Sequence, residues 1–271
     1  MRDTKEQKII VLTELNDSDN NLILHGIKIA SIFKKELCLF HNYKKKGKSE
    51  YGNIKRILND YKRVVKNTFP TLPVSSLITE GDLTYLLDIL TDDYDAILIL
   101  ARAHSFKKHA KSVRESPLPF LFINTDNTKI TNYTRIVAPI DLRKENSDIA
   151  LWCSYFGRFN NSEIIAIAAN DKNKANIRMA TKNIVLMKKL LVKFNIAHKI
   201  YKGKSSSLRI QSEALEFARS SKSDLMIILG SSVITPIDLL IGLPEYKIIK
   251  KAGNFPVLVI NPRRDMYILC D

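Results

Sequence analysis

Two segments in the second half of the chain carry residue types that could bind a nucleotide. Asp141 follows a short apolar run, and Gly230 follows another such run and precedes two serines. A carboxylate placed there could accept hydrogen bonds from an adenine or a ribose, and a glycine lets a phosphate approach bare backbone N–H groups. A simpler interpretation is that Asp141 caps the following helix and Gly230 permits a tight turn. The candidate binding residues are Pro139, Ile140, Asp141, Gly230, Ser231, Ser232 and Gly242.

The chain repeats itself, and these residues belong to the second of two similar halves. Lys8–Leu15 aligns with Arg135–Leu142 at an offset of 127, and Tyr94–Ala101 aligns with Ser223–Gly230 at an offset of 129. Repeats of this length are complete domains, far longer than the units of a solenoid. We therefore expect two domains, at residues 1–126 and 133–271, joined by the polar segment 125–134.

In each half, short apolar runs alternate with segments of helical periodicity. Such runs are typical of strands that lie under helices in a parallel sheet. The alternation predicts an α/β fold with two tandem doubly wound domains, each a five-stranded parallel sheet of order 3-2-1-4-5 flanked by helices. We expect the two sheets to pack as an intrachain pseudo-dimer. The expected strands are 9–15, 37–41, 74–79, 96–100 and 120–123, then 135–141, 163–169, 197–202, 224–230 and 256–261.

This strand order places the ends of the first and fourth strands side by side. Ligands of open α/β sheets bind beyond the carboxyl ends of the strands, where the strand order reverses. Asp141 and Gly230 should therefore face each other across one crevice. The residues expected to cap helices are Asp17 or Ser18, Asp82 after a turn at Gly81, and Ser206 or Ser207.

The composition limits the classes of function. The 271 residues carry a formal net charge of +15, and the three cysteines form no Cys-x-x-Cys pair. The apolar runs have strand length and the first residues are charged, so we expect a cytoplasmic protein without a signal peptide or membrane segment. The positive charge could attract nucleic acid, but the basic residues spread over helices of both halves without interleaved aromatic residues. We therefore expect no nucleic-acid partner.

Taken together, the sequence resembles the universal stress protein family in its tandem, two-domain form. The resemblance covers nearly the whole chain, with an acidic residue ending the opening strand, Gly81-Asp82 after the third strand, and the segments Asp224–Gly230 and Pro256–Ile260. It implies a role in stress adaptation. In ATP-binding members, it also implies a loop that cradles the phosphates and reads glycine, two residues, glycine, nine residues, glycine, then serine or threonine.

The sequence departs from that loop in both halves. Gly230 matches the first glycine, but Val233 and Leu243 occupy the next two glycine positions, and Gly242 falls one residue early. In the first half, Glu14 replaces the aspartate and Ala101 the first glycine, and the following loop is shorter and basic. The basic loop could attract an anion but offers no backbone nest. We interpret the first half as structural or as a surface for a protein partner.

Other patterns do not indicate a catalytic or metal site. Gly47-Lys48-Ser49 and Gly203-Lys204-Ser205 each lie between a strand and a helix, as a Walker A loop does, but each lacks the upstream glycine. The five histidines lack metal-ligand spacing.

The leading hypothesis is therefore a regulator in stress adaptation that binds ATP or another adenine nucleotide weakly in its second domain, without catalytic residues or a metal. One alternative is a scaffold for a protein partner that binds no nucleotide, with self-association into a homo-oligomer also open. Another is a slow ATP hydrolase that uses the second-domain crevice, although Asp141 is its only obvious acid and a magnesium site would want a second.

Overall fold

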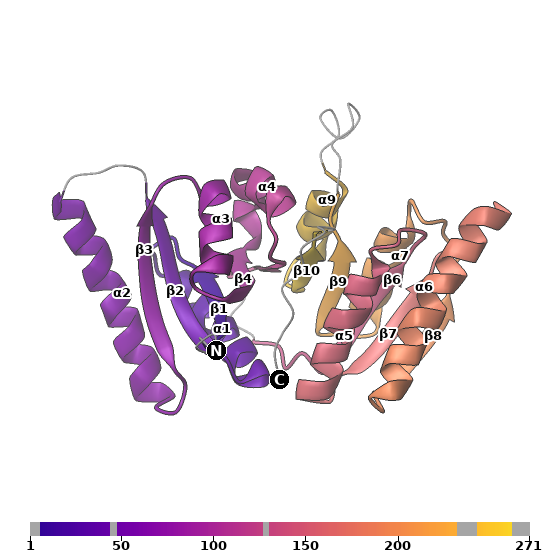
Figure 1. The fold of residues 1–271 in the computed structure, drawn as a ribbon, viewed down its shortest axis with the longest axis horizontal. Coiled ribbons are helices and arrows are strands. Elements are labelled where there is room, and N and C mark those ends of the chain that lie inside the picture. The colour runs from indigo at the N-terminus through magenta and orange to yellow at the C-terminus, as the bar shows by residue number, and fades with distance from the viewer. Residues whose placement is uncertain (1–5, 44–47, 127–129, 232–242, 262–271) are drawn as a thin grey trace. The chain divides into compact units, whose positions relative to one another are not determined.

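The computed structural model describes residues 6–43, 48–126, 130–231 and 243–261 (Figure 1). The chain divides into two compact units between Ile130 and Thr131. Each unit is an α/β sandwich in which helices cover both faces of a parallel sheet. Within the described residues, no helix is long and apolar enough to span a membrane.

The first unit has a five-stranded sheet of order β3-β2-β1-β4-β5, and all of its strand pairs are parallel. All seven residues of β4 are buried, as expected of a strand between two helical layers. Its elements are β1 (Lys8–Leu12), α1 (Asp19–Phe33), β2 (Glu36–Tyr43), α2 (Lys48–Thr68), β3 (Val74–Glu80), α3 (Leu83–Asp92), β4 (Ala96–Arg102), a 3-10 turn (Ala103–Ser105), α4 (Phe106–Glu115) and β5 (Phe120–Ile123).

The second unit repeats this order as β8-β7-β6-β9-β10, again with parallel pairs. Helix α5 packs beside α6 on one face of the sheet, and α7 packs beside α9 on the other (Figure 1). Its elements are β6 (Arg135–Ile140), α5 (Asn146–Asn160), β7 (Glu163–Ala168), α6 (Lys174–Lys193), β8 (His198–Lys202), α7 (Ile210–Ser220), β9 (Leu225–Leu229), α9 (Pro244–Ala252) and β10 (Val257–Ile260).

The predicted fold class and the strand order 3-2-1-4-5 are confirmed in both units. The first predicted strand is too long, because β1 ends at Leu12 and Leu15 adopts a left-handed backbone with φ of 60°. The turn at Gly81 and the cap at Asp82 are confirmed, since the Asp82 carboxylate accepts a hydrogen bond from the Thr84 N–H at 2.9 Å.

The other two predicted caps are wrong. Ser18 occupies the N-cap position of α1 but makes no capping bond with its side chain. Helix α7 begins only at Ile210, and the hydroxyl of Ser207 instead donates to the Asp171 carboxylate. Asp19 accepts the Leu15 N–H in the loop before α1, and Asp171 accepts the N–H of Ser207 itself.

Candidate functional site

The loops after β6 and β9 enclose a hollow of about 260 Å³ at the carboxyl end of the second unit's sheet. Asp141 contributes a carboxylate to this hollow although its side chain is almost fully buried. Ser231, Leu142 and Leu208 are among the other residues that line it. The hollow therefore lies at the predicted position, between the ends of the first and fourth strands of the unit.

The carboxylate of Asp141 is already paired within the chain. Arg143 lies two residues later and reaches it with Nε at 2.8 Å and a terminal guanidinium nitrogen at 2.6 Å. The backbone N–H of Arg143 and the amide of Asn146 donate to the other carboxylate oxygen at 2.8 and 2.7 Å. Both acceptor atoms that a ribose or adenine would use thus have donors in the free protein.

Arg143 also bridges the crevice between the ends of β6 and β9. Its second terminal nitrogen donates to the backbone carbonyl of Gly230 at 3.1 Å. The loop that carries it is held by Asn183 of α6, whose amide donates to the carbonyls of Asp141 and Arg143 at 2.9 and 2.8 Å. The positions of Asp141 and Arg143 are therefore fixed by α6 as well as by their own loop.

A second internal carboxylate occupies the donors at the end of β9. Glu245, in the first turn of α9 and 3% exposed, accepts the Ser231 N–H at 3.2 Å and the Ser231 hydroxyl at 2.9 Å. A carboxylate at these donors stands in the position that the phosphate-loop pattern gives to a phosphate. The N–H of Gly230 is occupied too, because it donates to the carbonyl of Ile260 at 2.8 Å.

Gly230 has a packing reason to lack a side chain. A Cβ atom added there would lie 2.7 Å from Oδ1 of Asn261 and 3.1 Å from a methyl of Val259. The close approach to β10 therefore favours a glycine here, whether or not a phosphate binds.

The remaining predicted residues divide into two groups. Pro139 and Ile140 are buried inside β6, where they pair with β7 and position the loop that carries Asp141. Ser232 and Gly242 lie outside the described residues, as does Val233. Leu243 immediately precedes α9.

Two solved structures are similar to this chain along almost its whole length. A Pseudomonas aeruginosa UCBPP-PA14 protein assigned to the universal stress proteins is 14% identical, with a TM-score of 0.61 and coverage of 95% of this chain and 94% of that one. A universal stress protein from Archaeoglobus fulgidus DSM 4304 is 11% identical, with a TM-score of 0.64 and coverage of 94% and 96%. The chain has the tandem universal stress protein fold.

A third structural match covers less than half of this chain. A universal stress protein in complex with cAMP aligns with 45% of this chain and 99% of its own length, at 19% identity and a TM-score of 0.36. No protein-family model matches the sequence, and no curated protein matches it.

The first unit has the equivalent crevice, lined by Glu14 and Asn16, and its charges are paired in a different way. Glu14, which aligns with Asp141, accepts a hydrogen bond from Arg102 at 2.9 Å, and Arg102 also donates to Asn16 at 2.8 Å. Arg102 comes from the end of β4, at the position that aligns with Ser231. In this unit the arginine therefore crosses the crevice in the opposite direction.

The loop after β1 is also filled by an internal carboxylate. Asp19, fully buried, accepts from the backbone N–H groups of Glu14, Leu15 and Asn16 at 3.0, 2.7 and 3.2 Å. Burial raises the pKa of Asp19, although these hydrogen bonds and Arg102 act in the opposite direction. Asn146 aligns with Asp19 and holds the matching loop of the second unit through its amide.

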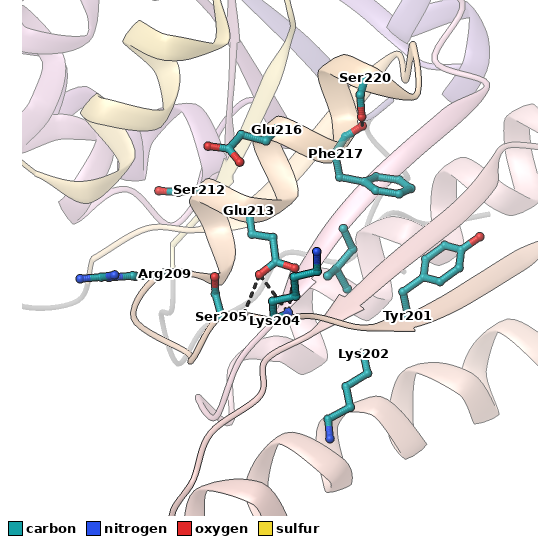
Figure 2. Close-up of a pocket in the computed structure, with 11 residues that line it drawn as sticks. Tyr201, Lys202, Lys204, Ser205, Arg209, Ser212, Glu213, Glu216, Phe217 and Ser220 are labelled. Carbon is teal, nitrogen blue, oxygen red and sulfur yellow. Dashed lines mark hydrogen bonds between the residues drawn. The ribbon is translucent and has the colours of Figure 1, made fainter.

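A third carboxylate fills the loop that resembles a Walker A sequence. Glu213 of α7 accepts the N–H of Lys204 at 2.8 Å and the N–H of Ser205 at 2.7 Å, as the dashed lines in Figure 2 show. Burial acts to raise the pKa of Glu213, but the hydrogen bonds from Lys204 and Ser205 prevail and lower it. The Gly203 loop thus binds an anion of the protein itself, which agrees with its rejection as a phosphate loop.

Arg143, Asn146, Asn183 and Glu245 are site residues that the sequence analysis missed. Asn146 had one available signal, since it aligns with Asp19 in the repeat. Glu245 follows the segment 232–242, and no pattern in the sequence indicates its role. Among the residues that the structure describes, no three His, Cys, Asp or Glu side chains are grouped so that they could hold a metal ion.

Proposed function

We propose that this protein is a cytoplasmic regulator in stress adaptation that acts by binding, and that its second-unit crevice binds the adenosine part of an adenine nucleotide weakly. The observation that carries this proposal is that Asp141 and Ser231 line one hollow while each is bonded to an internal partner, Arg143 or Glu245. A ligand can use these groups only by displacing that partner. The hollow of about 260 Å³ lies just below the roughly 300 Å³ at which small-molecule sites begin.

Weak affinity follows from this competition. Each internal hydrogen bond to a charged group that a ligand must replace is worth about 1–3 kcal/mol, so displacing one or two costs roughly a hundredfold in affinity. Such a site would respond only to high nucleotide concentrations. The universal stress fold of the whole chain supports the regulatory role.

Calorimetric titration of ATP and of adenosine tests the proposal. We expect one site per chain, abolished by Asp141→Ala and unaffected by the matched first-unit change Glu14→Ala. Thermal melts would show that both variants are folded. Two sites per chain, or equal binding by wild type and Asp141→Ala, would refute the assignment.

A scaffold for a protein partner is the second candidate. Leu208, on the wall of the same hollow, is 95% exposed and therefore accessible to an apolar side chain of a partner. Absence of ATP and adenosine binding in the titration, with partner binding that Leu208→Ser abolishes, would favour this role.

A further inference from the structure

A groove separate from the Asp141 crevice lies along the edge of the second unit. It has a volume of about 920 Å³ and runs between β8 and α7. Strand β8 is at one end of the sheet order of its unit, so no further strand of that unit covers it. Nothing in the proposed function uses this groove.

Aromatic and aliphatic side chains form the apolar part of the groove. Tyr201 of β8 is 44% exposed, and its ring packs against Phe217 of α7 with centroids 5.8 Å apart. Figure 2 shows the two rings on the same side of the hollow. Together they present an exposed aromatic surface, on which a planar ring could stack.

Cationic side chains surround this aromatic surface. Lys202, Lys204 and Arg209 line the groove and are exposed, and no ion pair joins them to any carboxylate of the described residues. In Figure 2, Lys202 extends away from the hollow, as expected because it follows Tyr201 in a strand and points to the opposite face of the sheet.

The opposite face of the sheet continues the positive charge. Helix α6 packs on that face and contains six lysine or arginine residues and no aspartate or glutamate. All six are exposed. Such residues are dispersed along the sequence, but the fold brings those of α6, β8 and the Gly203 loop to one edge of the second unit.

From these observations we propose that this edge binds single-stranded nucleic acid, with a base stacked on Tyr201 and phosphates at Lys202, Lys204, Arg209 and the exposed face of α6. The carboxylate of Glu216 also lines the groove and has no hydrogen-bond or ion-pair partner among the described residues. This carboxylate could accept hydrogen bonds from the amino groups of bases, whereas it would repel the carboxylates of an acidic peptide. A carboxylate beside cations and an aromatic ring therefore favours nucleic acid over an acidic protein segment.

Fluorescence anisotropy with labelled oligocytidylate and oligodeoxycytidylate of about 12 nucleotides tests this proposal on the full chain, since cytosine carries an amino group and single-strand sites commonly span about 4–16 nucleotides. Both probes should bind at low salt, and stronger binding of one would tell RNA from DNA. Four phosphate contacts predict a slope of about −3 for log K against log salt.

Matched variants separate the groove from the general positive charge. Tyr201→Ala should weaken binding by about tenfold, because stacking on an aromatic side chain contributes about 1–3 kcal/mol per base. Tyr85→Ala is the control, since Tyr85 is 74% exposed and lies beside Lys111 in the first unit. Lys202→Ala with Lys204→Ala should make the salt slope shallower by about 1.4, whereas Lys55→Ala with Lys66→Ala on α2 should leave it unchanged.

Several results would overturn the proposal. One is failure of both oligonucleotides to bind at low salt. Another is an equal loss on Tyr85→Ala and Tyr201→Ala. Binding of polyglutamate as tight as that of the oligonucleotides and insensitive to Tyr201→Ala would show a nonspecific polyanion surface. Binding of cytidine monophosphate as tight as that of the oligomer would show a mononucleotide site and exclude a site for a nucleic-acid strand.

Discussion

The carboxylate of Glu245 accepts both the backbone N–H and the hydroxyl of Ser231, at 3.2 and 2.9 Å. The two residues lie on either side of the segment 232–242, so this contact joins the start and the end of the loop whose sequence resembles a phosphate loop. The same carboxylate that orders these ends would repel a nucleotide phosphate placed at Ser231. This contact leads to the first prediction.

Glu245→Gln should strengthen ATP binding. The amide oxygen can still accept a hydrogen bond from Ser231, while the negative charge beside the phosphates is removed. We expect a gain of about tenfold, equivalent to about 1.4 kcal/mol. Calorimetry with ATP measures it, and Glu213→Gln, in the other carboxylate-filled loop, is the control that should leave the affinity unchanged. A gain for adenosine as large as that for ATP would contradict the electrostatic cause.

Arg102→Ala should destabilise the protein much more than an exposed ion-pair deletion does. The Arg102 side chain is 9% exposed and pairs with Glu14, which would be left partly buried without its main partner. Removing one partner of a buried pair costs about 3–5 kcal/mol. Urea denaturation measures this loss. The control is Arg63→Ala, whose partner Asp60 is exposed, and for such pairs we expect about 0–1 kcal/mol. Equal losses of stability for Arg102→Ala and Arg63→Ala would mean that the first-unit crevice is open to solvent.

Stability should fall as pH decreases from about 6.5 to about 4. Burial lowers the pKa of His25 and His109 to about 4 in the folded protein, whereas in the unfolded chain their pKa is near the ordinary value of 6.5. In this window the unfolded state binds more protons, so the free energy of unfolding rises with pH. Each histidine contributes up to about 3 kcal/mol, from about 1.36 kcal/mol per pKa unit.

Denaturation of His25→Gln and His109→Gln at several pH values tests this dependence. Each variant should show a shallower pH profile than wild type. His104→Gln is the control because that side chain is 55% exposed. The buried Asp19 has a raised pKa and gives a contribution of opposite sign at acid pH, so the variant comparison is more informative than the wild-type profile alone. Parallel profiles for wild type and both buried-histidine variants would contradict the prediction.

Gly230→Ala should destabilise the protein without any ligand present. The added methyl would lie 2.7 Å from Asn261 Oδ1, closer than packed atoms allow, and overpacking costs about 1–3 kcal/mol. Gly52→Ala is a matched control in the opposite direction. Its Cβ would meet no atom within 4 Å inside α2, and alanine in a helix is favoured over glycine by about 0.5–1 kcal/mol. Thermal melts of both variants measure the two effects.

The fold could be predicted from the sequence because its signals are local and occur twice. Unbroken apolar runs such as 96–100 and 225–229 are too short for a buried helix and so predict strands buried on both faces, and the shared offset indicates the same order in the two halves. The same reasoning placed Asp141 and Gly230 at neighbouring strand ends. What it could not supply was the partner of each polar group. Arg143 and Glu245 reach their partners through loop backbone and side-chain rotamers that no periodicity encodes.

The opposite origins of Arg143 and Arg102 mean that the segments of the two units are not interchangeable. Each unit provides one arginine for one acidic residue, but the first takes it from the end of β4 and the second from the loop after β6. A chimera that joined the β1 loop of the first unit to β9 of the second would have Glu14 facing Ser231 and no arginine. The reciprocal chimera would have Arg102 and Arg143 competing for Asp141. Recombination between the two copies is therefore penalised by unbalanced charge even where their backbones superpose.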